Sequence, residues 1–203
     1  GTAISAGTGN VTLAADGTVT VASVTNSGNL TVTSTAGSIE EQSTGADAAA
    51  DLVGVTLDLN AATGIGAAGT LEITGTTITA DSTGTGNVDI DSLATTGVTV
   101  TTLTAGMGNI TFDQTGGQTL AVTTSTATGS IVITNAGANL TATTVTASGA
   151  GNDATLTTTT SGNVPTAFAG DLYNAAPGTR QLRRIQRDGS DIVAGTLVND
   201  ADN

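Results

Sequence analysis

Short runs that alternate apolar and polar residues recur along the chain, and each run begins with a glycine. They occupy residues 9–13, 28–32, 69–73, 86–90, 108–112, 129–133 and 151–156. Successive runs start about twenty residues apart, with one double step, and a fixed period of this size is typical of solenoids. Alternation with a period of two residues predicts a β-strand in each run.

A second strand-like run follows the first within most units, at residues 18–21, 38–39, 76–79, 98–101, 118–122 and 139–142. Val24 and Leu103 belong to runs that would supply a third face. We therefore expect an all-β fold, a right-handed parallel β-helix (β-solenoid) with coils of about 20 residues. The alternation directs Thr12, Thr31, Thr111, Asp89 and Asp91 outward, and it directs into the core Val11, Leu13, Leu30, Val32, Val88, Ile90, Ile110, Phe112, Ile131 and Ile133.

One segment interrupts the rhythm within the shaft. Residues 40–51 are acidic and alanine-rich, and they predict a loop excursion with a helical turn. Solenoids often place recognition in such loops, and the other interpretation is an inert surface excursion. The candidates for a recognition contact are Glu40, Glu41, Asp47 and Asp51.

The repeat fades after Asn163, which divides the chain into a β-helix shaft over 1–163 and a C-terminal segment over 164–203. The second segment is interpreted as a cap, a linker or a docking segment. Residues 177–179 precede a predicted short helix over 180–187. Its basic residues are candidate assembly contacts with an acidic neighbour: Arg180, Arg183, Arg184 and Arg187.

The charge of the chain argues against several classes of partner. The formal net charge is −13, and all basic residues fall within 180–187. Nucleic-acid binding needs basic side chains to neutralise phosphates, so we expect no nucleic-acid partner. No apolar stretch approaches the length of a membrane span, so we expect no membrane insertion.

The residue types also limit the chemistry. The chain has no His, Cys or Lys, which leaves carboxylates as the only common catalytic groups, and we expect no enzymatic activity, no catalytic residues and no cofactor. Oxygen donors of the kind that Ca²⁺ prefers occur at Asp89 and Asp91, at Glu40 and Glu41, and at 199–203, but none completes a calcium motif. We therefore expect no metal site and interpret these carboxylates as solvated.

Asn-x-Thr triplets at Asn10, Asn29, Asn109 and Asn139 match the N-glycosylation pattern. They arise because Gly-Asn-apolar-Thr is the repeat itself. A ladder of stacked asparagines, bonded from coil to coil, explains them more economically than glycosylation.

Outward Thr-x-Thr pairs favour an alternative function, ice binding, because regular threonine arrays on a flat β-helix face resemble those of ice-binding proteins. The first-strand series argues against it, since Glu72, Asp89 and Val132 interrupt the pattern. The pairs are Thr18/Thr20, Thr31/Thr33, Thr99/Thr101, Thr141/Thr143 and Thr155/Thr157.

Residues 57–66, followed by the repeated Gly-Asn-Val/Ile-x-Ile units, resemble the large exported adhesins of the filamentous haemagglutinin type. The resemblance covers roughly residues 1–163 and lies in rhythm and composition. It implies an internal shaft segment, exported across a Gram-negative envelope to the cell surface or beyond, that serves in attachment or biofilm matrix. We therefore expect an extracellular structural and adhesive rod. Its expected partners are further copies, stacked head to tail, and a host-cell, surface or matrix polysaccharide ligand.

Overall fold

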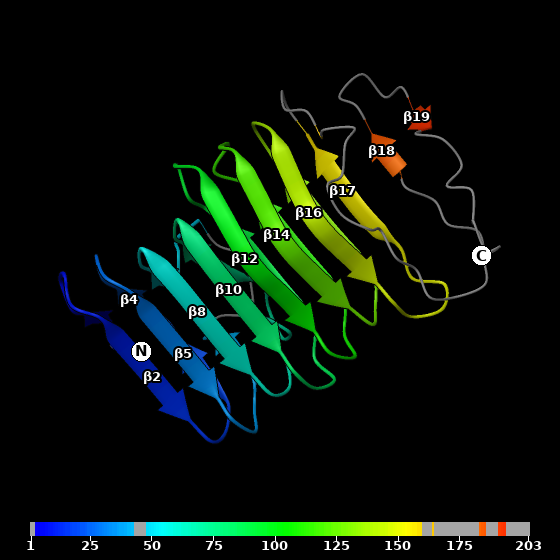
Figure 1. Ribbon diagram of the computed structural model, residues 1–203. Helices are drawn as coiled ribbons and strands as arrows, with labels where there is room; N and C mark the ends of the chain where they lie inside the picture. Colours follow the sequence, from blue (N-terminus) through cyan, green and yellow to red (C-terminus); the bar gives the residue numbers. More distant parts are fainter. Residues whose placement is uncertain (1–2, 43–47, 160–163, 165–182, 186–190, 194–203) are drawn as a thin grey trace.

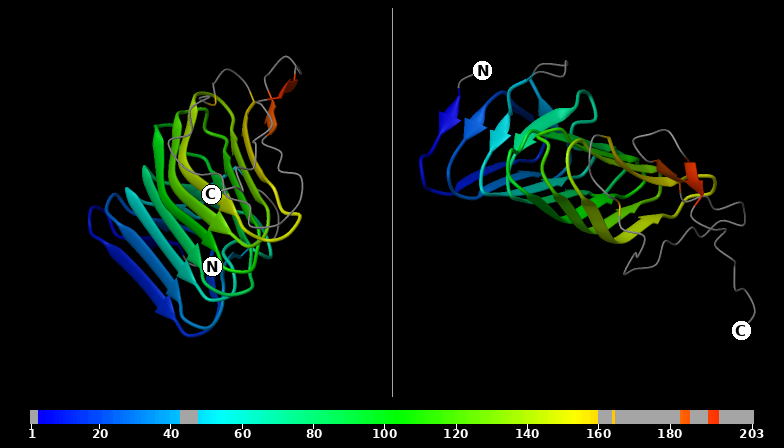
Figure 2. Two further views of the ribbon diagram at one scale, coloured as in Figure 1. Left: turned by 45° about the vertical axis from the view of Figure 1, so that its right-hand side comes forward. Right: turned by 90° about the horizontal axis from the view of Figure 1, so that it is seen from above.

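The computed structural model describes residues 3–42, 48–159, 164, 183–185 and 191–193. In this part of the chain the protein is a parallel β-solenoid of about seven turns, with coils of about 21 residues and no helix. Figure 1 shows the strands of successive coils lying side by side, and Figure 2 shows the coils following one another from the first to the last. No described helix is long and apolar enough to cross a membrane.

Two large sheets of parallel strands form the walls. The seven-stranded sheet contains, in spatial order, β2 (Val11–Ala15), β5 (Leu30–Ser34), β8 (Thr56–Ala61), β10 (Thr77–Ser82), β12 (Val98–Ala105), β14 (Leu120–Ala127) and β16 (Leu140–Ala147). The eight-stranded sheet contains β1 (Ile4–Ser5), β4 (Val24–Thr25), β7 (Leu52–Val53), β9 (Leu71–Thr74), β11 (Val88–Ser92), β13 (Ile110–Gln114), β15 (Ile131–Asn135) and β17 (Ala154–Thr158).

Two smaller pairs complete the described strands. β3 (Val19–Val21) pairs in parallel with β6 (Ile39–Glu41) in the first coils. β18 (Arg183–Ile185) pairs antiparallel with β19 (Asp191–Val193) beyond the last coil. The short helix predicted over 180–187 is therefore wrong at 183–185. Ile185, Ile192 and Val193 are β-branched, and this residue type favours strands over helices.

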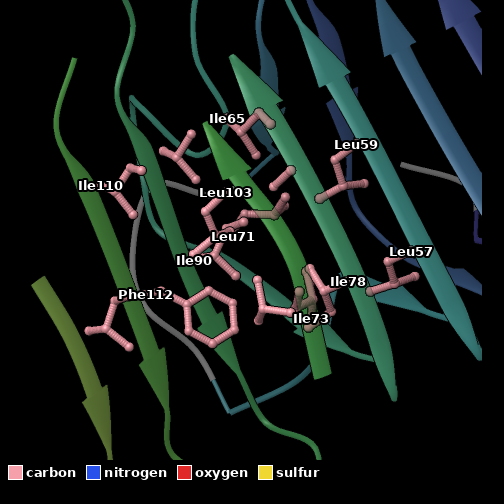
Figure 3. Packing of buried hydrophobic residues seen from close by; sticks show 14 of the residues in the cluster. Leu57, Leu59, Ile65, Leu71, Ile73, Ile78, Ile90, Leu103, Ile110 and Phe112 are labelled. Atoms are coloured by element: carbon pink, nitrogen blue, oxygen red, sulfur yellow. The ribbon is translucent and has the colours of Figure 1, made fainter. Parts of the chain in front are cut away.

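The core lies between the two sheets, and most of its inward positions hold one aliphatic side chain; Phe112, Gln114 and Ser125 are buried exceptions. Leu59, Ile78, Ile90 and Ile110 are all buried. Figure 3 shows such residues of β8 to β13 meeting between the sheets. The inward and outward assignments from the sequence are confirmed, although Leu13, in the first coil, is only partly buried.

The glycine-initiated runs form strands of one sheet in the first coils and strands of the other sheet in the later coils. The runs at 9–13 and 28–32 form β2 and β5 of the seven-stranded sheet, whereas the runs from 69–73 onward form strands of the eight-stranded sheet. The double step in the sequence is the place where the motif changes sheet. A third sheet in the later coils was also predicted wrongly, because Leu103 and Thr104 continue β12 after a bulge between Val100 and Thr102.

The predicted bonding of asparagine side chains to backbone from coil to coil is confirmed at Asn10 and Asn109. The backbone N–H of Asn29 donates to Oδ1 of Asn10 at 3.1 Å, at the start of two neighbouring strands. In the other sheet the N–H of Asn109 donates to Asn87 Oδ1 at 2.9 Å, and the N–H of Ser130 donates to Asn109 Oδ1 at 2.8 Å. These bonds satisfy backbone donors at the corners, where the strand ladder has not yet begun.

Candidate functional site

The acidic excursion leaves the solenoid between β6 and β7, in its first coils. Ile39, Ile65 and Val88 occupy equivalent positions on neighbouring coils, as do Leu52, Ile73 and Ser92 further along the same face. From Val88 to Ser92 the strand runs without a break, whereas residues 40–51 lie between the equivalent positions in the second coil. The excursion therefore begins after β6 and returns at β7.

Three acidic side chains converge at the base of this excursion. Glu41 ends β6, Asp51 precedes β7, and Glu72 lies in β9 on the next coil. One carboxylate oxygen from each residue lies within 4.8 Å of the other two. The exposed fractions are 5% for Glu41, 7% for Asp51 and 0% for Glu72. We call these residues the buried acidic cluster.

The backbone holds the cluster together. The N–H of Asp51 donates to the carbonyl oxygen of Glu72 at 2.8 Å, and the carbonyl oxygen of Asp51 accepts from Val24 at 2.7 Å. Glu41 is aligned with Val21 of the neighbouring β3. The side chain of Glu40, one position earlier, accepts a hydrogen bond from the N–H of Ala68 at 2.9 Å. Both ends of the excursion are thus tied to the coil that follows.

The cluster brings three carboxyl groups together inside the fold. Ionised carboxylates at this separation would repel one another, and burial would strengthen the repulsion. Lys, Arg and His are absent from residues 1–179 of the sequence. Carboxylate oxygens are the donors that Ca²⁺ prefers, but we assign no metal, since nothing beyond the three acidic side chains identifies a ligand there.

The structure changes the interpretation of the predicted recognition residues. Glu41 was interpreted as solvated, and both Glu41 and Asp51 were candidates for a recognition contact; both side chains are buried, with carboxylate oxygens within 4.8 Å of one another at the base of the excursion. Glu40 is half-buried, and Asp47 lies outside the described residues. Arg183 and Arg184 begin β18, whereas Arg180 and Arg187 also lie outside the described residues.

Glu72 was missed because it stands between two core residues, Leu71 and Ile73, at a strand position that the alternation directs outward. A signal was present, since Asp51 and Glu72 are separated by one coil length and stacked coils place such residues side by side. The same register extends the negative charge beyond the cluster. Asp91 is aligned with Glu72, and Asp113 is aligned with Asp91.

Burial raises the pKa of Asp91 above its ordinary value of 3.8, and the Asp113 charge adds to this rise, whereas a hydrogen bond from Thr115 opposes it. The Thr115 hydroxyl donates to Asp91 Oδ1 at 2.7 Å. Burial likewise raises the pKa of Asp89, a hydrogen bond from Thr70 opposes the rise, and the charges of Asp113 and Asp91 add to it.

These shifts predict a pH dependence of stability. A carboxyl group whose pKa is higher in the folded than in the unfolded protein stabilises the fold at pH values below the ordinary pKa of 3.8. This stabilisation is lost as the pH rises through the pKa of the folded state. We expect Asp91→Asn to raise the free energy of unfolding at neutral pH by about 0.5 kcal/mol. Urea titrations from acid to neutral pH measure the effect, and Asp153→Asn, at an exposed position directly before β17, is the control. Equal gains in both variants would contradict the prediction.

Comparison of the chain with models of protein families, with curated protein sequences and with solved structures found no match. The class of protein is therefore set by the architecture, which is a parallel β-solenoid of about seven turns.

Proposed function

We propose that the protein is an extracellular structural and adhesive rod that serves in attachment or biofilm matrix. The observation that carries the proposal is the unbroken parallel stack, which runs from β2 to β16 in one sheet and from β1 to β17 in the other. Coils spaced about 4.8 Å apart give a shaft on the order of 35 Å for seven turns. One continuous core makes such a shaft stiff, and stiffness suits a spacer that holds contacts away from a surface.

The rhythm that the chain shares with exported adhesins of the filamentous haemagglutinin type supports this proposal and favours a place on or outside a Gram-negative cell. A polysaccharide or host-cell ligand is the proposed adhesive partner. The acidic excursion is the proposed contact, because among the described residues its two ends leave the regular wall of the solenoid after β6 and rejoin it at β7.

We further propose that copies stack head to tail. The seven-stranded sheet ends at β2, whose outer edge has no neighbouring strand among the described residues. Such an edge is a template for another strand. At the other end the sheet finishes at β16, so the two ends present strands of the same direction and similar alternation. The arginine segment would then meet the acidic shaft of the next copy.

The hydrogen-bond pattern of β2 identifies the groups that face the open edge. The N–H of Val11 donates to Asn29 at 2.9 Å, and the carbonyl oxygen of Ala15 accepts from Thr35 at 3.0 Å. In a parallel strand, alternate residues bond to opposite neighbours. Val11 and Ala15 therefore bond to β5, whereas Thr12 and Ala14 direct their backbone groups to the open edge.

This pattern gives a test that spares the fold. Ala14→Pro removes an edge-facing donor, and proline is tolerated on edge strands. We expect the wild-type protein to form species larger than a monomer in light scattering at high concentration and low salt, and Ala14→Pro to abolish them with its circular dichroism unchanged. Ala14→Ser, which keeps the N–H, is the control. A wild-type protein that stays strictly monomeric would contradict head-to-tail stacking.

A further inference from the structure

The outer face of the seven-stranded sheet becomes a threonine surface in its last three strands. On β12, β14 and β16 every outward position holds threonine except Ala121. We call this set the threonine face. Its members are Thr99, Thr101, Thr102, Thr104, Thr123, Thr124, Thr126, Thr141, Thr143, Thr144 and Thr146.

The register of the sheet arranges these threonines in columns. Thr102, Thr124 and Thr144 are aligned across three strands, and the next column contains Thr104, Thr126 and Thr146. The first column continues through Thr79 in β10, and it resumes beyond Asp58 with Thr31 and Thr12. Neighbours within a column are about 4.8 Å apart, and residues two positions apart along a strand are separated by roughly 6.6 Å.

The objection that the sequence raised against a regular array does not apply to this face. Glu72, Asp89 and Val132, which interrupt the first-strand series, all belong to the eight-stranded sheet. The threonines of the seven-stranded sheet come largely from the second run of each unit. Figure 1 shows the strands that carry them side by side. Over β12, β14 and β16 the two columns that contain Thr102 and Thr104 are therefore unbroken, although the sequence pattern looked broken.

The chemistry of the face fits an ordered water lattice. Each threonine presents one hydroxyl and one methyl group, and its β-branched side chain has few rotamers. The three strands carry no charged and no aromatic residue, although the chain has a net charge of −13. The face therefore offers no rings on which sugars could stack and no cations for anionic ligands. We propose that the threonine face binds the surface of ice.

A substitution at the centre of the face tests the proposal. Thr124 lies in the middle strand, with Thr102 and Thr144 on either side. A tyrosine there would project a ring above the grid and separate it from a flat crystal surface. We expect the full chain to inhibit ice recrystallisation and to show thermal hysteresis, and Thr124→Tyr to lose both down to the level of an albumin control.

The matched control is Thr111→Tyr, at a half-buried outward position in β13 of the other sheet, and it should keep full activity. If circular dichroism shows that Thr124→Tyr does not fold, Thr102→Tyr in the adjacent coil replaces it, and we expect the same loss of activity. A wild-type chain without activity above albumin would overturn the proposal. So would a loss in Thr111→Tyr that equals the loss in Thr124→Tyr. Neither outcome bears on head-to-tail stacking, which is measured separately with Ala14→Pro.

Discussion

Replacing Phe112 with alanine is expected to lower the free energy of unfolding by about 3–5 kcal/mol. Phe112 is fully buried in β13 and is aligned with Ile90 on one neighbouring coil and with Ile133 on the other. Figure 3 shows its ring between the two sheets. The strand ladder fixes the spacing of the coils, so the walls cannot close around the cavity that the missing ring leaves.

Urea denaturation followed by circular dichroism measures this change. Met107→Ala is the control, because Met107 is 65% exposed and surface substitutions are usually within about 0.5 kcal/mol. A loss below about 1 kcal/mol in Phe112→Ala would mean that the core at this coil is loosely packed, and it would contradict the stacked interior described above.

The second large effect is expected at a glycine of the repeat motif. A Cβ on Gly108 would overlap the carbonyl oxygen of Gly86 on the preceding coil. The carbonyl belongs to the backbone and the position of a Cβ is fixed by its own backbone, so no side-chain rotation relieves the overlap. We expect Gly108→Ala to destabilise the protein by about 2–3 kcal/mol, a value typical of overpacking.

Gly9 provides a control within the same motif. It begins the first of these runs, and among the described residues a Cβ there would meet only the carbonyl oxygen of Ala6 at an ordinary 3.5 Å. Gly9→Ala should be neutral or stabilising by up to about 1 kcal/mol. The same urea titrations compare the two variants, and equal effects would show that the motif glycines serve local conformation instead of coil packing.

The difference between Gly108 and Gly9 also indicates why glycine recurs in the motif. Glycine is the residue that most readily adopts positive φ at corners, and of the glycines that begin the runs only Gly151 does so among the described residues. Among the described residues only Gly7, Gly64, Gly66, Gly117 and Gly151 have positive φ. Gly28, Gly86, Gly108 and Gly129 are instead required by the close approach of one coil to the next. Sequence shows that glycine recurs, but the distance to the next coil depends on the fold.

Much of the fold could be predicted because strand alternation and coil length are local signals. The inward set, the asparagine ladder and the parallel stack all follow from a period near twenty and a side-chain period of two. The sheet to which each run belongs could not be predicted in this way. Both sheets have the same alternation, so only pairing between coils shows that β5 and β9 lie on different walls.

The candidate sites could not be predicted from the sequence, because they depend on which strands pair between coils. The buried acidic cluster joins Glu41, Asp51 and Glu72, which are scattered in sequence and meet only because an excursion leaves the second coil. The threonine face likewise required the register of β12, β14 and β16, including the bulge that turns both Thr101 and Thr102 outward. Residue types alone indicated solvated acids and broken threonine pairs.

Electron microscopy of the vitrified protein tests the central claim most directly, namely that this chain is a stiff solenoid that extends by end-to-end stacking. We expect rods of varying length whose axial repeat is near 4.8 Å throughout, including across the junctions between copies. Compact particles of uniform size, without that axial repeat, would contradict the account.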